Sequence, residues 1–172
     1  PYSREFSAAF DMVPFCFDAF SEFEDDSTFD DACKRGSYIL AYSKTVIKRI
    51  CDQAVLRNWR DKKIYLVNSP HWMSEIGNKL AVDCDFVVIW YFDHERNEYR
   101  VSLRSFHEGI DVGEVAKRFG GGGHKKAAGF SLPNVPNGDN HIDIIFREDV
   151  ELVPYDAGII PHLVPAAEAW DD

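Results

Sequence analysis

The sequence predicts an α/β fold, with a mixed sheet of about five strands flanked by helices and preceded by a helical N-terminal segment. Two observations predict this class. Apolar residues recur at helical spacing through the first third of the chain. After residue 60, short apolar or alternating runs typical of strands alternate with short helical patterns. The 172 residues, 45% of them hydrophobic, suffice for one domain with a core, or for one domain and part of another.

The N-terminal third is expected to be helical. A Phe-rich stretch over residues 4–23, interrupted by Pro14, predicts two short helices. A long helix over residues 28–56 follows, because apolar side chains recur there every three to four residues. Gly36 lies inside it and is expected to weaken the helix by about 1 kcal/mol relative to alanine.

Strands and short helices are expected next. The run FVVIWYF over residues 86–92 is apolar at every position, which is typical of a strand buried on both faces. Residues 99–106 alternate, which places Arg100 and Arg104 together on the polar face of a strand. The complete set for this region is a strand at 63–68, a helix at 73–82, a strand at 86–92 and a strand at 99–106.

Four consecutive glycines separate the last expected elements. Asp111, with Glu114 three residues later, is expected to cap a helix that ends at Phe119. After the glycines, the sequence predicts a short helix at 124–128, strands at 130–132 and 142–146, and an extended tail.

Charge is unevenly distributed along the chain. The net charge is −10, and residues 1–32 and 133–172 each carry one basic and nine acidic side chains. The middle is therefore mildly basic, which favours an anionic ligand, although acidic ends that only aid solubility are the alternative. So small a positive charge does not suit long duplex DNA, and short single strands or nucleotides fit better.

The four cysteines lie far apart, at Cys16, Cys33, Cys51 and Cys84, and form no CxxC pair. We expect free thiols in a reducing, cytoplasmic compartment. A run of about 18 apolar residues does not occur, so no membrane partner is expected.

The run from Gly120 to Phe130 carries the most specific functional signal. Glycines at the start of a helix let the backbone approach a ligand closely, and the free N–H groups there favour an anion. His124 and Lys125 add donors and positive charge at the same place. The alternative is a tight turn followed by a solvated basic helix.

Two other positions suit an anion or a base. Arg104 on a strand could hold a phosphate with its guanidinium fork, or could simply face solvent. Ser74 opens the helix at 73–82 and either contributes to a donor site or only caps the helix. Asn78 follows one turn later and could contact a base edge.

These linked motifs resemble the DHH-associated domain, the C-terminal partner of the Asp-His-His phosphoesterases. The matching stretch runs from residue 67 to 132, and GGGHKKAAGF is its most specific part. The resemblance implies three segments: the tail of a DHH catalytic domain with a linker helix over 1–60, the associated substrate-binding domain over 61–150, and an acidic Pro-containing tail over 151–172.

The resemblance also implies what the domain does. In that family it closes over the metal-bearing domain and holds the nucleotide end of short RNA, single-stranded DNA, cyclic dinucleotides or nucleotide bisphosphates. By matching position, the implied substrate contacts come from Arg104, Gly121, Gly122, Gly123, His124, Lys125, Ser74 and Asn78.

No Asp-His-His triplet occurs in the sequence. We therefore expect no cofactor in this chain, and a divalent metal, manganese or magnesium, in a DHH domain that precedes Pro1 in the parent chain. The whole would be a metal-dependent phosphodiesterase or exonuclease, with a homodimer left open. Two alternatives are a stand-alone nucleic-acid-binding module without catalysis and a tRNA-contacting domain of the alanyl-tRNA synthetase type.

Overall fold

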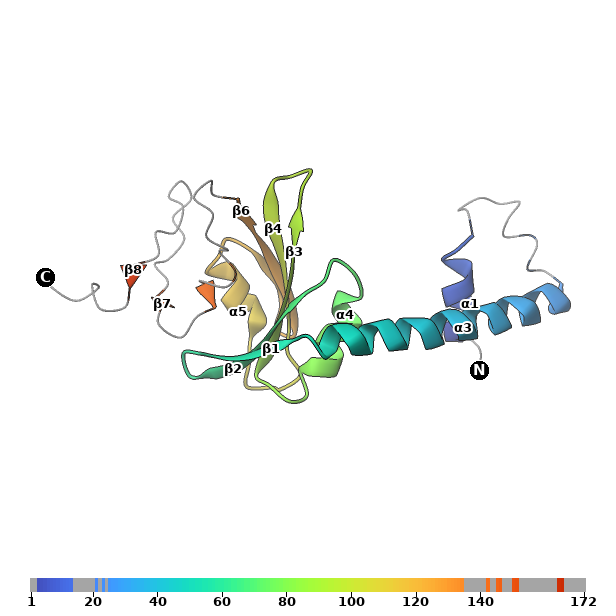
Figure 1. The fold of residues 1–172 in the computed structure, drawn as a ribbon, viewed down its shortest axis with the longest axis horizontal. Coiled ribbons are helices and arrows are strands. Elements are labelled where there is room, and N and C mark those ends of the chain that lie inside the picture. The colour runs from blue at the N-terminus through green and yellow to red at the C-terminus, as the bar shows by residue number, and fades with distance from the viewer. Residues whose placement is uncertain are drawn as a thin grey trace, which may run out of the picture. The chain divides into compact units, whose positions relative to one another are not determined.

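The computed structural model describes residues 3–13, 21, 23, 25–134, 142, 145 and 146, and the backbone of 150–151 and 164–165. It divides into two compact units, Pro1–Arg49 and Ile50–Asp172. Helices build the first unit, and a six-stranded mixed sheet with flanking helices builds the second (Figure 1). The predicted α/β class is confirmed.

Two helices form the first unit. α1 spans Ser3–Phe10 and α3 begins at Asp26 and ends at Cys51. Phe6 of α1 stacks on Phe29 of α3 with ring centroids 5.0 Å apart, and two further rings, Phe10 and Phe23, contact Phe6. Aromatic packing therefore joins α1 to α3. The second short helix predicted after Pro14 falls mostly outside the described residues.

Gly36 allows the close approach of these helices. A Cβ atom at Gly36 would lie 1.6 Å from the backbone oxygen of Glu5. Real Cβ atoms do not come so near, so the absence of a side chain is a packing requirement. The sequence indicated only the cost of glycine to the helix, because the partner helix could not be seen in the local pattern.

Gly36→Ala is expected to destabilise the first unit, although alanine is the better helix former by about 1 kcal/mol. The backbone of Glu5 must move to admit the methyl group, and such overpacking costs about 1–3 kcal/mol. Urea denaturation followed by circular dichroism measures the change, with the exposed neighbour Ser37→Ala as control. A Gly36→Ala chain as stable as the parent would contradict the close crossing.

Six strands form the sheet of the second unit: β1 (Val55–Trp59), β2 (Lys62–Asn68), β3 (Phe86–Asp93), β4 (Glu98–Arg104), β5 (Gly122–His124) and β6 (Ala127–Pro133). Their order across the sheet is β1-β2-β3-β4-β6-β5. β2 and β3 run parallel, joined by the crossover helix α4 (Met73–Leu80), and the other neighbouring pairs are antiparallel. Two short strands, β7 (Val150–Glu151) and β8 (Val164–Pro165), pair separately.

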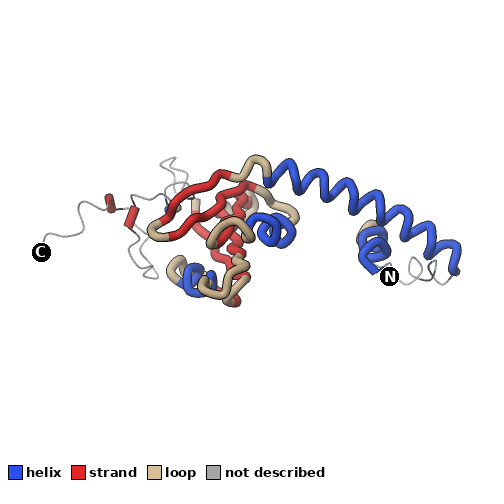
Figure 2. The backbone as a smooth tube through the Cα atoms, turned by 90° about the horizontal axis from the view of Figure 1, so that it is seen from below, coloured by secondary structure: helices blue, strands red, loops and turns tan. Residues whose placement is uncertain are grey.

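One helix lies on each face of the sheet (Figures 1 and 2). α4 packs on β3 and β4, and α5 (Val112–Lys117) packs on β4, β5 and β6 from the other side. The Asp111 carboxylate accepts hydrogen bonds from the Gly113 N–H (2.9 Å) and the Glu114 N–H (3.2 Å). The predicted cap at Asp111 is thus confirmed.

The main core fills the space between the sheet and α5. Because side chains alternate along a strand, one set from each strand points to this side. These buried side chains include Val88, Leu103 and Phe130 from the sheet and Val112 and Ala116 from α5. The opposite face is buried only where α4 covers it, and the rest of that face holds polar and small residues.

Three sequence predictions for this unit are wrong. The helix expected to end at residue 56 ends at Cys51, and Val55–Trp59 forms β1, a strand that the sequence analysis missed. The helix at 124–128 is a β-hairpin. The strand at 142–146 is instead helical at Ile142 and Ile145, where the Phe146 N–H donates to the Ile142 carbonyl at 3.2 Å.

Cys33, Cys51 and Cys84 are free, as predicted, and all three are buried, whereas Cys16 lies outside the described residues. Burial raises the pKa of the Cys84 thiol to about 11, so it is a poor nucleophile at neutral pH. No helix within the described ranges has the length and apolar character that crossing a membrane requires.

Candidate functional site

The glycine-rich segment folds as a β-hairpin. Gly122–His124 form β5, Lys125 and Lys126 form the turn, and β6 begins at Ala127. The expected helix start is therefore absent, and its dipole cannot attract an anion here. Positive charge at this place comes from side chains.

The turn of the hairpin is anchored by backbone groups. The Lys125 carbonyl accepts from the Val112 N–H at 2.9 Å, and the Lys126 carbonyl accepts from the Ser105 N–H at 3.1 Å. The hydroxyl of Ser105, one of two buried polar side chains in the described chain, also donates to the Lys125 carbonyl at 3.4 Å. These bonds tie the turn to the end of β4 and to the start of α5.

The glycines of the hairpin differ in whether the fold has room for a side chain at their positions. A Cβ at Gly121 would lie 2.2 Å from the Gly129 oxygen, and one at Gly123 would lie 2.5 Å from the Ala128 Cα, with Gly123 also at φ +141°. Both are required by packing or conformation. A Cβ at Gly122 would meet no heavy atom of the described chain within 4 Å. Packing therefore does not explain why a glycine occupies position 122.

The strand register brings Arg104 and His124 to one face. Ala127 of β6 pairs with Arg104 of β4 on one side and with His124 of β5 on the other. Directly opposed residues point to the same side of a sheet, so the two cationic or donor side chains flank the small Ala127. Two strand spacings separate them, which is about 10 Å. We call Arg104, Ala127 and His124 the anion row.

Arg104 is half-buried and hydrogen-bonded only to neutral groups among the described residues. It donates to the Leu103 carbonyl at 2.9 Å and to the Ser74 hydroxyl of α4 at 3.4 Å. Its aliphatic stem crosses α4 at Gly77, where a Cβ would lie 2.4 Å from the Arg104 Cγ. Burial lowers the pKa of the guanidinium, although it stays charged. The charge is thus partly desolvated, and no carboxylate among the described residues compensates it.

The start of α4 adds backbone donors near Arg104. Trp72 precedes the helix in a left-handed conformation (φ 51°, ψ 32°) and provides no side-chain cap. The first N–H groups of α4 therefore lack the usual capping oxygen. Asn78, predicted as a contact, is exposed one turn beyond Ser74 on the same side of the helix.

Lys125 and Lys126 share one acidic neighbour. The Lys125 ammonium lies 3.7 Å from a carboxylate oxygen of Glu108, and Lys126 donates a hydrogen bond to the other oxygen. The bond from Lys126 lowers the pKa of Glu108. Both lysines are consequently partly neutralised, unlike Arg104.

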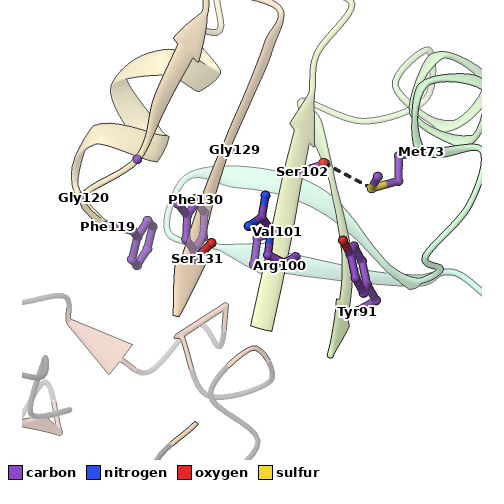
Figure 3. Close-up of a pocket in the computed structure, with 11 residues that line it drawn as sticks. Met73, Tyr91, Arg100, Val101, Ser102, Phe119, Gly120, Gly129, Phe130 and Ser131 are labelled. Carbon is purple, nitrogen blue, oxygen red and sulfur yellow. Dashed lines mark hydrogen bonds between the residues drawn. The ribbon is translucent and has the colours of Figure 1, made fainter. Parts of the chain in front are cut away.

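A cavity of about 420 Å³ lies next to the anion row, because Ser102 and Gly129 in its lining are two residues along β4 and β6 from Arg104 and Ala127. Figure 3 shows the residues that line it. Its lining includes Met73, Tyr91, Arg100, Ser102, Gly129 and Ser131. This cavity was not predicted from the sequence. The alternation of β4 was the available signal, because Arg100 and Ser102 share the face of Arg104. The strand predicted at 130–132 was too short, however, since β6 spans Ala127–Pro133 and includes Gly129 of the lining.

Comparisons with known proteins agree on one family. The model of the DHHA1 domain family matches residues 42–148. The chain belongs to the DHHA1 domain family. This confirms the resemblance to the domain associated with DHH-family phosphoesterases. The matched range includes every site residue discussed above.

Individual relatives share parts of this DHHA1 chain. An uncharacterized protein of Acanthamoeba polyphaga mimivirus is 31% identical over 142 residues, 78% of this chain and 34% of that protein. The oligoribonuclease NrnB of Bacillus subtilis is 43% identical over 70 residues, 39% of this chain and 16% of NrnB. The chain thus matches only 34% and 16% of the lengths of these two relatives.

A solved structure supports the fold. The pGpG-specific phosphodiesterase PggH of Vibrio cholerae superposes with a TM-score of 0.51 at 12% identity, over 74% of this chain and 44% of PggH.

The DHHA1 structure groups most of the residues predicted for the site. Arg104, His124 and Ser74 face one side of the sheet together with Gly122, whereas Gly121 and Gly123 hold the hairpin in shape. In the described part of the chain, no group of three or more histidine, cysteine, aspartate or glutamate side chains is arranged to hold a metal ion.

Proposed function

We propose that this DHHA1 domain binds the phosphate end of a short single-stranded oligonucleotide or nucleotide on the anion row. The observation that carries the proposal is the guanidinium of Arg104. It is half-buried, it lacks a carboxylate partner among the described residues, and it lies across the small Ala127 from His124. A desolvated, uncompensated charge of this kind is stabilised by a bound anion.

The shape of the row suits a phosphate group. Arg104 presents a planar fork of donors from β4, and His124 presents a second donor from β5, on the other side of β6. Ala127 between them leaves the space that an anion needs. Lys125 and the uncapped start of α4, at Ser74, add positive potential nearby.

In the parent protein, we propose that this site holds a substrate for a DHH catalytic domain. That domain would supply the divalent metal, manganese or magnesium, and the phosphodiester hydrolysis. The names of NrnB and PggH, an oligoribonuclease and a pGpG phosphodiesterase, support substrates of one or a few nucleotides. Binding without catalysis, by this chain as a stand-alone module, involves the same residues.

Calorimetric titration of the chain with pApA and with ApA tests the phosphate site. We expect pApA to bind about tenfold or more tightly, because a charge-assisted contact contributes about 1.5–3 kcal/mol. Affinity for pApA should fall with salt, whereas affinity for ApA should change little. Equal affinities for the two ligands would overturn the proposal and leave the hairpin glycines as packing devices.

Glu108→Gln is expected to strengthen pApA binding a few-fold at low salt. The change removes the carboxylate that neutralises Lys125 and Lys126, and it alters no contact of Arg104. Glu114→Gln removes the same charge from an exposed pair with Lys117 and serves as the control. The same titration measures both, and equal effects of the two substitutions would mean that only net charge matters.

A further inference from the structure

The cavity beside the anion row continues the same sheet face. Ser102 and Gly129, which line it, pair with each other and lie two residues along β4 and β6 from Arg104 and Ala127. Two residues of strand span about 7 Å. A group covalently attached to a phosphate on the row is therefore close enough to enter the cavity.

Residues of α4, β3, β4 and β6, and of the segment before β5, line the cavity. Ser102, Gly129 and Ser131 form the floor from two neighbouring strands. Met73 and Tyr91 line one side, and Gly120 lies on the other (Figure 3). Its volume falls within the range of small-molecule sites, which is about 300–1,000 Å³. A flat group with an attached small ring fits such a space.

The polar groups of the cavity favour a neutral ligand over a second phosphate. Arg100 lines it, but its guanidinium already pairs with the Glu98 carboxylate at 3.1 Å. It therefore offers hydrogen bonds and a planar surface without an uncompensated charge. The Ser102 hydroxyl donates to the Met73 sulfur at 3.3 Å, a weak acceptor that a ligand oxygen or nitrogen replaces readily.

We propose that this cavity is a nucleoside subsite, which holds the base and ribose of the nucleotide whose phosphate lies on the anion row. The proposal rests on the proposed function for the position of the phosphate. Tyr91 provides the aromatic surface for the base, and Arg100 and Ser131 provide its hydrogen bonds. Aromatic surfaces bind any base by stacking, so the subsite discriminates little between bases.

Among the described residues, Tyr91, Phe119 and Phe130 are the aromatic residues that line the cavity, and Phe119 and Phe130 are buried in the core at 3% and 6% exposure, so Tyr91 is the one that offers a surface to a base. Phe106 is the aromatic alternative outside the cavity. Phe106 lies two residues beyond the end of β4 and is 59% exposed, but it does not line the cavity. Stacking on Phe106 would place the base outside the cavity. The two aromatic side chains thus give the proposal a direct alternative.

The experiment compares adenosine 5′-monophosphate, ribose 5-phosphate and adenosine by calorimetric titration of the 172-residue chain. In the parent, the monophosphate should bind about tenfold more tightly than ribose 5-phosphate, since stacking contributes about 1–3 kcal/mol per base. Tyr91→Ala should remove that difference and leave ribose 5-phosphate binding unchanged, because only the surface for the base is lost. Ser131→Phe fills the floor on which the base and ribose lie, so it should weaken the binding of both phosphorylated ligands. Phe106→Ala should change neither, and circular dichroism checks that each variant is folded.

Two results would overturn the subsite. One is equal affinity of the parent for adenosine monophosphate and ribose 5-phosphate. The other is loss of the difference in Phe106→Ala with Tyr91→Ala unaffected. The proposed function fails separately, if the monophosphate binds no more tightly than adenosine. Adenosine binding that is lost in Tyr91→Ala would then still support the nucleoside subsite.

Discussion

Gly122→Val is expected to abolish pApA binding while the chain remains folded. A Cβ at this position meets no heavy atom of the described chain within 4 Å, so the fold has room for the side chain. Valine is also a strong strand former, and Gly122 lies in β5. Because Gly122 pairs with Gly129, the new side chain projects onto the ligand face, between the anion row and the cavity.

The loss should exceed that of His124→Ala. Removing one hydrogen-bond donor to a charged group costs about 1.5–3 kcal/mol, roughly 10- to 150-fold in affinity. A branched side chain in the ligand's path instead excludes the ligand. Titration with pApA measures both variants, and thermal unfolding by circular dichroism confirms that each is folded.

Two other glycines provide matched controls for Gly122→Val. Gly109 also has open space around its Cβ direction, but it is not on the hairpin, so Gly109→Val should bind like the parent. Gly123→Val should lose binding together with stability, because its backbone is at φ +141° and its Cβ would contact Ala128. If Gly122→Val binds pApA normally, the ligand does not lie over β5.

Sequence patterns located most of the sheet because its central strands have strong signals. The apolar run of β3 and the alternation of β4 are local properties, and both strands appear within two residues of the predicted bounds. β1 lacks such a signal. Its residues continue the helical spacing of α3. The helix ends where the N–H groups of Gln53 and Ala54 donate to the carbonyl groups of Ile50 and Cys51, three residues back in the chain.

The hairpin was missed because local preference and tertiary structure disagree there. Lysine and alanine favour helices, so Lys125–Ala128 suggested one. In the fold, the pairing of β6 with β4 along seven residues, and the anchoring of the turn by Val112 and Ser105, determine the conformation instead. These partners lie 13 to 35 residues away in sequence. Arg104 and His124, both predicted from the motifs, nevertheless lie on one face of the sheet, because the register pairs each of them with Ala127.

Arg104→Ala is expected to weaken pApA binding by about 1–3 kcal/mol, roughly 5- to 150-fold, without unfolding the chain. The polar contacts of the side chain are few: a 3.4 Å hydrogen bond to Ser74 and one to the Leu103 carbonyl of its own strand. The Cβ atom, which alanine keeps, also lies against α4 at Gly77, so part of the packing remains. Removing a desolvated charge that has no carboxylate partner in the described chain should leave stability equal or slightly higher.

The salt dependence of pApA binding shows whether the affinity lost in Arg104→Ala comes from a lost phosphate contact. Arg96 lies in the turn after β3, is exposed and pairs with Asp93 at 3.3 Å, so Arg96→Ala removes the same charge away from the row. The logarithmic salt dependence of binding should decrease by about 0.7 in Arg104→Ala and stay unchanged in Arg96→Ala, as expected when one phosphate contact is lost from a single strand. Arg104→Lys should restore the salt dependence but only part of the affinity, because lysine keeps the charge without the planar fork. If Arg104→Ala and Arg96→Ala behave alike, the guanidinium does not contact the phosphate and Arg104 only packs against α4 at Gly77.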